Sequence, residues 1–313
     1  MPVYAIAIAL LLDFILGDPA WRWHPVRVHG HLITRIESYC RTIPIPPKTQ
    51  GAVFLVLNMF CFIVPISVLI LLSSAGGRLL SLLTQAVLIY FALGGTCLAR
   101  EVSGVSDSLM RDGVRGGRGK IRMLVSRDVD MMSEGDIVSS AIETLAENFS
   151  DSACATLLYA AIGGPVLAWI HRISNTLDAM VGYKTEEYAD FGFASAKLDD
   201  ILNFLPSRIS ALIIALVAPS VHGNISAACI GARSDGALLS SPNSGYPIAA
   251  FAGALGVKLC GPMRYFGELK DKPFIGHGPR PLESDLARAL TLYWNAYALA
   301  AVASILTAKM MLI

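Results

Sequence analysis

Charge is scarce in this sequence, and that scarcity limits what the protein can be. Only 16% of its 313 residues are charged, against roughly 25% in average soluble proteins. The formal net charge is +1, so the chain lacks the basic excess with which proteins bind nucleic acid. Its six cysteines are widely spaced, with no CxxC pair and no Cys/His spacing typical of a metal site. A nucleic-acid partner and a cysteine-based metal centre are therefore not expected.

Short nucleotide-binding and hydrolase motifs are also missing. The basic stretch GVRGGRGK (113–120) has the look of a phosphate loop, but Val114 and Ile121 occupy positions that the loop GxxxxGK[ST] requires to be Gly and Ser or Thr. No HExxH, GxSxG or GxGxxG sequence stands in a suitable setting. This stretch is interpreted as a mobile basic loop.

Apolar runs, in contrast, are long and numerous, and the mean hydropathy is +0.56. A helix needs about 20 mostly apolar residues to cross a bilayer. The clearest such windows are 52–72 and 79–99, and weaker ones are 153–170, 209–221 and 289–313. The chain is therefore predicted to be an all-α, polytopic helical integral membrane protein, with one membrane-embedded domain over 1–313. The apolar N-terminal run has no basic flank and no small-residue cleavage site, so it is expected to be retained.

The distribution of basic residues predicts the orientation. They are densest in 18–50 and 100–127, and the positive-inside rule places both blocks in the cytoplasm. The segment 52–99 between them then crosses twice, with Gly76-Gly77 as the turn. A break is expected at Gly163-Gly164-Pro165, which would make 153–170 re-entrant or let 171–208 fold back. We expect a multi-pass protein of the cell membrane whose polar loops and short helices form a site at the cytoplasmic interface.

Three carboxylates recur at helical spacing before the third apolar window. Glu143, Glu147 and Asp151 stand at i, i+4 and i+8 in DIVSSAIETLAENFSDS (136–152), which would stack them on one face of a helix. Like charges at that spacing repel. Two interpretations stay open: the face is merely solvated, or a cation or basic partner offsets the repulsion.

Two further polar blocks have the composition of ligand-binding segments. In 175–209, Asp178, Asp199 and Asp200 are candidate magnesium ligands, because Mg²⁺ commonly binds one or two carboxylates together with phosphate oxygens. The alternative is that acidic residues simply favour helix N-termini. In 241–281, many Gly and Pro residues forbid one long helix, and the turns around its lysines could hold an anion through backbone amides.

Taken in order along the chain, these segments resemble those of the CobD/CbiB family, the adenosylcobinamide-phosphate synthases of cobalamin biosynthesis. The matching segments are LLDFILGDP and HPVR (11–27), SRD (126–128), ETLAEN (143–148), NTLDAMVGYK (175–184), SAKLDD and LPSR (195–208), SPN (241–243), YFGE (265–268) and DKPFIG (271–276). The resemblance spans about residues 10–295. This ordered set is far more specific than any one motif.

The resemblance implies an ATP-dependent amide bond between adenosylcobyric acid and (R)-1-amino-2-propanol O-2-phosphate, or a related aminoalcohol phosphate. An acyl-phosphate intermediate and magnesium, bound as a complex with ATP, are expected. Two alternatives are a non-catalytic membrane sensor or scaffold of the same fold, and an intramembrane magnesium-dependent prenyl or phosphoryl transferase. Expected partners are the corrinoid and the aminoalcohol phosphate as substrates, the lipid bilayer, and a second copy of the chain or other cobalamin-pathway enzymes.

The same resemblance assigns candidate site residues. The expected catalytic residues are Asp128, Glu143, Glu147, Asn148, Asn175 and Asp178. Expected metal ligands are Glu147, Asp151, Asp199 and Asp200. Expected substrate and phosphate contacts are Asp13, Asp18, His24, Arg27, Lys184, Arg208, Asn243, Glu268 and Lys272.

Within the N-terminal stretch, Asp13 and Asp18 are expected to line a cavity at the membrane surface and Arg27 to bind phosphate in bidentate fashion. The chain departs from the usual family pattern at Ser152, Ile248 and His277. Relatives typically have Gly, Glu and Asp at these positions, so an altered amine preference or a reduced activity is anticipated.

Overall fold

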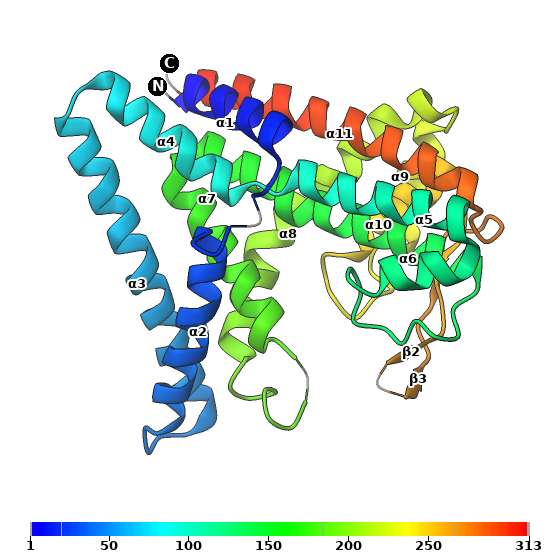
Figure 1. Ribbon diagram of the computed structural model, residues 1–313, viewed down its shortest axis with the longest axis horizontal. Helices are drawn as coiled ribbons and strands as arrows, with labels where there is room; N and C mark the ends of the chain where they lie inside the picture. The colour runs from blue at the N-terminus through cyan, green and yellow to red at the C-terminus, as the bar shows by residue number, and fades with distance from the viewer. Residues whose placement is uncertain (1, 20, 184, 266, 312–313) are drawn as a thin grey trace. The chain divides into compact units, whose positions relative to one another are not determined.

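The computed structural model describes residues 2–19, 21–183, 185–265 and 267–311, and it confirms the predicted all-α class (Figure 1). Its helices are α1 (Pro2–Leu16), α2 (Pro25–Arg41), α3 (Pro47–Ala75), α4 (Arg78–Ala92), α5 (Gly95–Ile121), α6 (Glu134–Asn148), α7 (Ala155–Val181), α8 (Phe193–Val217), α9 (Ile225–Asp235), α10 (Gly245–Leu255) and α11 (Glu283–Met310). A π-helix covers Phe149–Cys154 and a 3₁₀ turn covers Ala218–Val221. Four short strands form two antiparallel pairs: β1 (Leu259–Cys260) with β4 (Phe274–Ile275), and β2 (Met263–Tyr265) with β3 (Glu268–Lys270).

Five helical stretches are long and apolar enough to cross a membrane, as the hydropathy predicts. They are Pro47–Ala75, Arg78–Ile121, Glu134–Val181, Phe193–Val221 and Glu283–Met310. Large apolar side chains such as Phe60, Leu71 and Leu72 are more than half exposed on α3. Such a surface is unfavourable in water and suited to lipid. The chain is a polytopic helical membrane protein.

The contacts within the chain group its residues into two compact units. Unit 1 comprises 1–94, 155–203 and 301–313, and unit 2 comprises 95–154 and 204–300. Both α8 and α11 contribute residues to both units. That the whole chain forms a single membrane domain stays a prediction.

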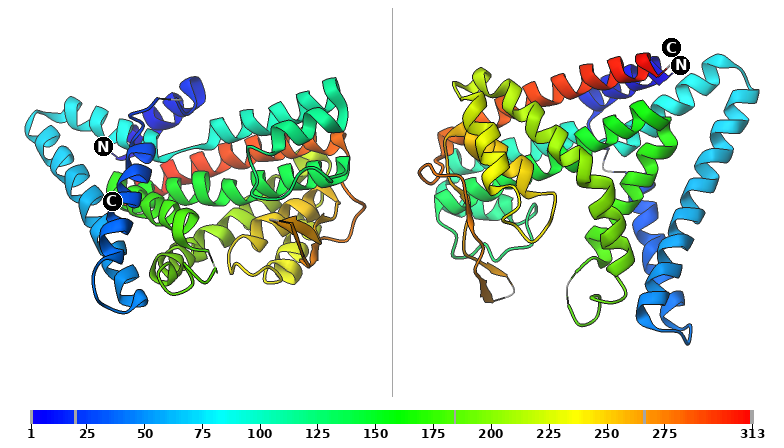
Figure 2. Two further views of the ribbon diagram at one scale, coloured as in Figure 1. Left: turned by 60° about the horizontal axis from the view of Figure 1, so that its bottom comes forward. Right: turned by 180° about the vertical axis from the view of Figure 1, so that it is seen from behind.

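Unit 1 contains the predicted helical hairpin, with one correction. Helices α3 and α4 are joined by Gly76-Gly77, as expected, and Gly77 has a φ of +108°, which favours glycine (Figures 1 and 2). The window 79–99 is not one helix, however, because α4 ends at Ala92 and α5 begins at Gly95. Hydropathy did not predict this break, because Leu93 and Gly94 are apolar and hydropathy depends on composition, not on backbone conformation.

The predicted break in the third apolar window is present. Gly163 and Gly164 leave helical geometry, Gly164 with a φ of +64°, and Pro165 follows them inside α7. Proline has no N–H and clashes with the preceding turn, which favours interruption at this point. In unit 1, the Trp169 indole N–H donates to the Leu88 carbonyl of α4 at 2.8 Å. The second half of α7 is thereby fixed against α4, while its re-entrant placement in a bilayer stays a prediction.

Unit 2 contains α5, α6, α9, α10 and the four strands. The stretch 113–120 is not the expected loop, because it lies within α5 after a kink at Gly113. Helices α9 and α10 pack closely side by side. A Cβ at Gly253 would lie 2.4 Å from the Ala227 carbonyl oxygen, so this glycine permits the close packing of α9 and α10. Gly256 has a different role, because it caps α10 with a φ of +70°. The Gly- and Pro-rich segment after it forms the short strands and not a long helix, as predicted.

Candidate functional site

Unit 2 holds a cavity of about 460 Å³ with a mixed polar and apolar lining. Its volume lies within the range of small-ligand pockets, roughly 300–1,000 Å³. Its lining residues are Arg127, Glu143, Glu147, Leu238, Leu239, Ser240, Ser241, Ser244, Ile248, Cys260, Asp271, Lys272 and Pro273. The cavity therefore brings together three of the predicted site residues, Glu143, Glu147 and Lys272.

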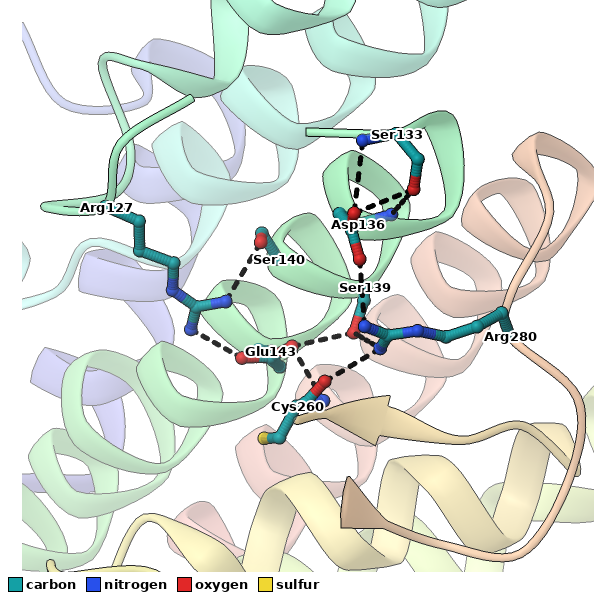
Figure 3. Close-up of polar contacts among 8 residues, drawn as sticks. All are labelled: Arg127, Ser133, Asp136, Ser139, Ser140, Glu143, Cys260 and Arg280. Carbon is teal, nitrogen blue, oxygen red and sulfur yellow. Dashed lines mark hydrogen bonds and ion pairs between the residues drawn. The ribbon is translucent and has the colours of Figure 1, made fainter. Parts of the chain in front are cut away.

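Glu143 lies on α6, and three hydrogen-bond donors bind its carboxylate. The helix starts at Ser133 with a reciprocal capping box to Asp136, which fixes its first turn. One carboxylate oxygen of Glu143 accepts from the Ser139 hydroxyl at 2.7 Å and from the Cys260 backbone N–H at 3.0 Å, and the other accepts from Arg127 (Figure 3). The side chain is only 3% exposed. Glu143 is thus placed to orient Arg127 and β1.

Arg127 is the basic partner that the sequence left unidentified. It lies in the connection between α5 and α6, and its guanidinium donates to Glu143 and to the Ser140 hydroxyl, the latter at 2.9 Å. Burial lowers the pKa of Arg127, but the adjacent Glu143 carboxylate more than reverses this, and the net pKa is raised. Of the two interpretations of the acidic face, a basic partner is correct for Glu143.

Cys260 joins α6 to the C-terminal strands through its backbone. Its φ is +59°, a left-handed conformation that a residue with a side chain rarely adopts. The Glu143 carboxylate accepts its N–H, and Arg280 donates to its carbonyl at 2.7 Å while also bonding Asp136 at 2.8 Å (Figure 3). These bonds hold the conformation in place. Burial raises the pKa of the Cys260 thiol well above its usual range, and Glu143 raises it further.

The segment that carries the three predicted carboxylates changes its helix type after Asn148. The α-helix ends at Asn148 and the chain continues as a π-helix, in which Asp151 lies. Whether Asp151 shares one face with Glu143 and Glu147 is not fixed by these bounds, and their stacking stays a prediction. Glu147 is exposed on the cavity, whereas Asp151 is half-buried. The Asn148 amide donates to the Thr144 carbonyl at 2.9 Å, which turns it back along its own helix.

A serine-rich loop leads from α9 into the first turn of α10 at the cavity. Ser240, Ser241 and Ser244 all line the cavity, and Ser244 is the N-cap of α10. A helix N-terminus carries partial positive charge, which favours anions, although here the Ser244 and Tyr246 N–H groups already have acceptors and Pro247 has no N–H. The Ser241 hydroxyl accepts from the backbone N–H groups of Asn243 and Ser244, both at 3.3 Å. The loop thus has a defined conformation beside the cavity.

Arg208 and Asn243, two predicted phosphate contacts, bind each other. The Arg208 guanidinium donates to the Asn243 side-chain oxygen at 2.9 Å and to the Pro242 carbonyl at 3.2 Å. It also lies between the rings of Phe204 and Tyr246, 3.7 and 4.0 Å from their centroids. Neither residue lines the cavity, and both support the serine loop. Their contact with phosphate stays a prediction.

The hairpin of β2 and β3 carries the remaining predicted residues of unit 2. Asp128 accepts from the Gly267 N–H at 2.7 Å and so anchors the hairpin turn, and Glu268 is exposed on β3. The Lys272 ammonium donates to the Tyr265 hydroxyl at 2.6 Å and lies 4.6 Å from its ring centroid. Among the described residues, Lys272 forms no ion pair. Two of its three N–H donors therefore stay available at the cavity.

Unit 1 brings together a second group of predicted residues. Asp178 on α7 and Asp199 and Asp200 on α8 are close enough to repel one another electrostatically. One oxygen of Asp199 accepts from Asn203 at 2.9 Å, and the Asn203 oxygen contacts a ring nitrogen of His171 at 2.8 Å. The other Asp199 oxygen is buried and makes no hydrogen bond of good geometry with the described residues, and Asn175 is the neighbouring donor to this carboxylate.

This acidic group is compatible with a cation. A buried carboxylate oxygen is costly unless a cation or donor reaches it. Across the part of the chain that the structure describes, no three His, Cys, Asp or Glu side chains are placed to hold a metal ion by themselves. A magnesium ion completed by phosphate oxygens stays a prediction. Asn175 is half-buried on the same helix as Asp178. Lys184 lies outside the described residues.

The N-terminal residues have structural partners. His24 contacts Asp18 at 2.8 Å, and its other ring nitrogen accepts from the Val26 N–H, so His24 caps α2. Asp13 is buried on α1, whereas Arg27 is exposed. Arg27 forms no ion pair with any residue that the structure describes. Its side chain is exposed, and the predicted contact with phosphate stays a prediction.

Sequence reasoning missed several residues that build the cavity. Arg127 lies in the quoted SRD segment, yet only its neighbour Asp128 was selected. The pairing of Arg127 with Glu143, 16 residues later, and the approach of Cys260 and Arg280 depend on tertiary packing. The one available signal was that a carboxylate on an apolar helix needs a basic partner.

The family model described as "CobD/Cbib protein" matches residues 6–293 of the chain. Cobalamin biosynthesis protein CobD of Pelobacter propionicus is 38% identical over 98% of this chain and 95% of its own length. The proteins of the same name from Geobacter metallireducens and Brucella suis are 40% and 35% identical, over 88% and 94% of this chain and 87% and 93% of their own lengths. No solved structure matches the chain significantly.

Proposed function

The chain belongs to the CobD/CbiB family of cobalamin biosynthesis proteins, and from this premise we propose that it is an adenosylcobinamide-phosphate synthase embedded in the membrane. The reaction is the ATP-dependent joining of a propionate carboxylate of adenosylcobyric acid to the amine of (R)-1-amino-2-propanol O-2-phosphate or a related aminoalcohol phosphate. The observation that carries the proposal is the unit 2 cavity, which combines groups that bind anions with carboxylates.

The chemistry requires activation of the acid. A carboxylate carbon is weakly electrophilic and its oxygen leaves poorly, so a free amine does not displace it. Transfer of the γ-phosphoryl group of ATP to the carboxylate gives an acyl phosphate and ADP. The amine then attacks the acyl carbon, phosphate leaves, and the amide forms. Holding the amine beside the acyl phosphate makes this second step effectively intramolecular.

The lining residues divide between positioning and proton transfer. Glu143 accepts three hydrogen bonds and is nearly inaccessible, so it acts as a positioning residue for Arg127. Glu147 is exposed on the same cavity and is the better candidate to accept the proton that the amine loses. Lys272 stabilises the negative charge of a phosphate group, while Arg127, which is paired with Glu143, lines the same cavity.

Magnesium would accompany ATP as its complex and neutralise polyphosphate charge. In unit 1, Asp199 with Asp178 or Asp200 would bind it together with phosphate oxygens, because these carboxylates lie close enough to repel one another and a cation would offset that repulsion. Glu147 and Asp151 are the candidate ligands in unit 2.

The site is proposed to face the cytoplasm, where ATP is available. This orientation follows the basic residues that cluster in 18–50 and 100–127, which the positive-inside rule places on that side. Cysteine labelling from each side of sealed vesicles at Asp151 and at Glu268 tests it. Labelling of both positions from the outer side alone would contradict the orientation.

The first experiment is a direct assay of the reaction. The purified, detergent-solubilised protein is incubated with ATP, Mg²⁺, adenosylcobyric acid and the aminoalcohol phosphate, and the amide is identified by mass spectrometry. Product that requires ATP is expected. Glu147→Gln should reduce the rate strongly, whereas Glu134→Gln, an exposed residue of α6 outside the cavity, should not. Absence of product from folded protein, with an active relative in parallel, would refute the proposal.

A further inference from the structure

The size and charge of the unit 2 cavity restrict what it can hold. Its volume of about 460 Å³ suits a small ligand, whereas a corrin ring with its side chains is a much larger molecule. Two cations and three carboxylates line it, a formal charge of −1: Arg127, Lys272, Glu143, Glu147 and Asp271. That balance disfavours a triphosphate. A molecule with one ammonium and one phosphate group matches both signs of charge.

The lining offers one cation for one phosphate group. Arg127 is neutralised by Glu143, and Lys272 forms no ion pair among the described residues. Ser240 and Ser244, whose side chains carry hydroxyl groups, line the same cavity, and Ser244 is the N-cap of α10. Together they supply the donors that a single phosphate monoester needs.

An apolar wall adjoins these donors. It consists of Leu238, Leu239, Ile248 and Pro273. Ile248 is 3% exposed and stands four residues after Ser244 on α10. Residues at this spacing share one face of a helix, with their Cβ atoms roughly 6 Å apart. An alkyl group next to a phosphate bound at Ser244 would therefore contact Ile248.

We infer that this cavity is the binding site of the aminoalkyl phosphate and that Ile248 recognises the alkyl branch beside the phosphate ester. The inference rests on the proposed function and adds to it the location of one substrate and a residue that determines specificity. In (R)-1-amino-2-propanol O-2-phosphate, a methyl group is attached to the carbon that carries the phosphate. Ethanolamine phosphate lacks that methyl group, and a hydrophobic pocket distinguishes one such group by roughly tenfold.

A competition assay tests the role of Ile248. Both amines are supplied at equal concentration with ATP, Mg²⁺ and adenosylcobyric acid, and the ratio of the two amide products is measured by mass spectrometry. The wild-type protein should prefer the branched amine by roughly tenfold, and Ile248→Ala should bring the ratio close to one. Leu255→Ala, a buried α10 residue outside the cavity, should leave it unchanged.

Ile248→Val provides a milder variant should Ile248→Ala fail to fold, and its ratio should lie between the other two. An unchanged ratio in a folded Ile248 variant would overturn the assignment of this residue, while amide formation itself would still support the synthase.

A binding measurement locates the substrate independently of turnover. Calorimetric titration of the purified protein with ethanolamine phosphate, without ATP or corrinoid, should give binding that Lys272→Met weakens at least tenfold. Lys270→Met, a neighbour on β3 outside the cavity lining, should not weaken it. Equal binding by both variants would place the amine elsewhere. Displacement by ATP would assign the cavity to the nucleotide and also overturn the inference.

Discussion

Replacing Arg127 by Met should destabilise the protein far more than an ordinary ion pair would suggest. Its partner Glu143 is 3% exposed and Arg127 itself 13%. Arg127→Met leaves the Glu143 carboxylate buried with only Ser139 and the Cys260 N–H as donors. Removing one member of a buried pair typically costs about 3–5 kcal/mol, because the remaining charge is uncompensated.

The double variant separates this cause from a simple loss of packing. In Arg127→Met with Glu143→Gln, no buried charge is left unpaired, so the loss should be smaller than the sum of the single losses by about 2–3 kcal/mol. Reversible unfolding in mixed micelles, followed by circular dichroism, measures the four free energies. Arg122→Met is the matched control, because its ion pair with Asp130 is exposed and contributes at most about 1 kcal/mol.

Equal losses in the free energy of unfolding for Arg127→Met and Arg122→Met would refute a strong buried pair between Arg127 and Glu143. Additive single losses would likewise show that Arg127 and Glu143 do not depend on each other. In either case the cavity would have no rigid polar wall, and the positioning role given to Glu143 would be lost.

Three further predictions follow from single sites. Burial lowers the pKa of His29 to about 4, although a hydrogen bond with Asn58 opposes this shift. Between pH 6.5 and 4, the unfolded chain therefore binds a proton at His29 that the folded protein does not bind. The free energy of unfolding should therefore decrease by up to about 3 kcal/mol as the pH is lowered from 6.5 to 4. In His29→Phe, the free energy of unfolding, measured in a pH series of unfolding curves, should depend less on pH than in the wild-type protein. Arg208→Lys removes the planar contacts to the serine loop and should raise KM several-fold in steady-state assays, whereas an unchanged KM would argue against a supporting role. A Cβ at position 182 would lie 2.0 Å from a carboxylate oxygen of Asp178, so Gly182→Ala should reduce turnover more than it lowers Tm; a loss of both in proportion would indicate a purely structural glycine.

The membrane helices and the interruptions of the chain were largely readable from the sequence. Hydropathy responds to composition, which is local, so the long apolar stretches were recognised, as were the turn at Gly76-Gly77 and the break at Gly163-Gly164-Pro165. The division of 79–99 was not visible, because Leu93-Gly94 is apolar in composition and its backbone conformation depends on packing.

The candidate site was predictable only in part. Glu143, Glu147 and Lys272 were identified from the family motifs, and they line one cavity. Arg208 and Asn243 were also selected, yet the structure pairs them with each other, away from that lining. A motif identifies which side chains matter, but it does not say which of them point to the ligand and which to one another.

By itself, the sequence determined that this chain is a helical membrane protein and that it carries the ordered motifs of one biosynthetic family, because both properties depend on residue type and order alone. Only the tertiary structure decided that Arg127 pairs with Glu143, that Asp151 lies in a π-helix, and that Ile248 lines the cavity. These depend on backbone path and on contacts between distant segments. The free energies of burial and pairing that fix them exist only once the chain has packed.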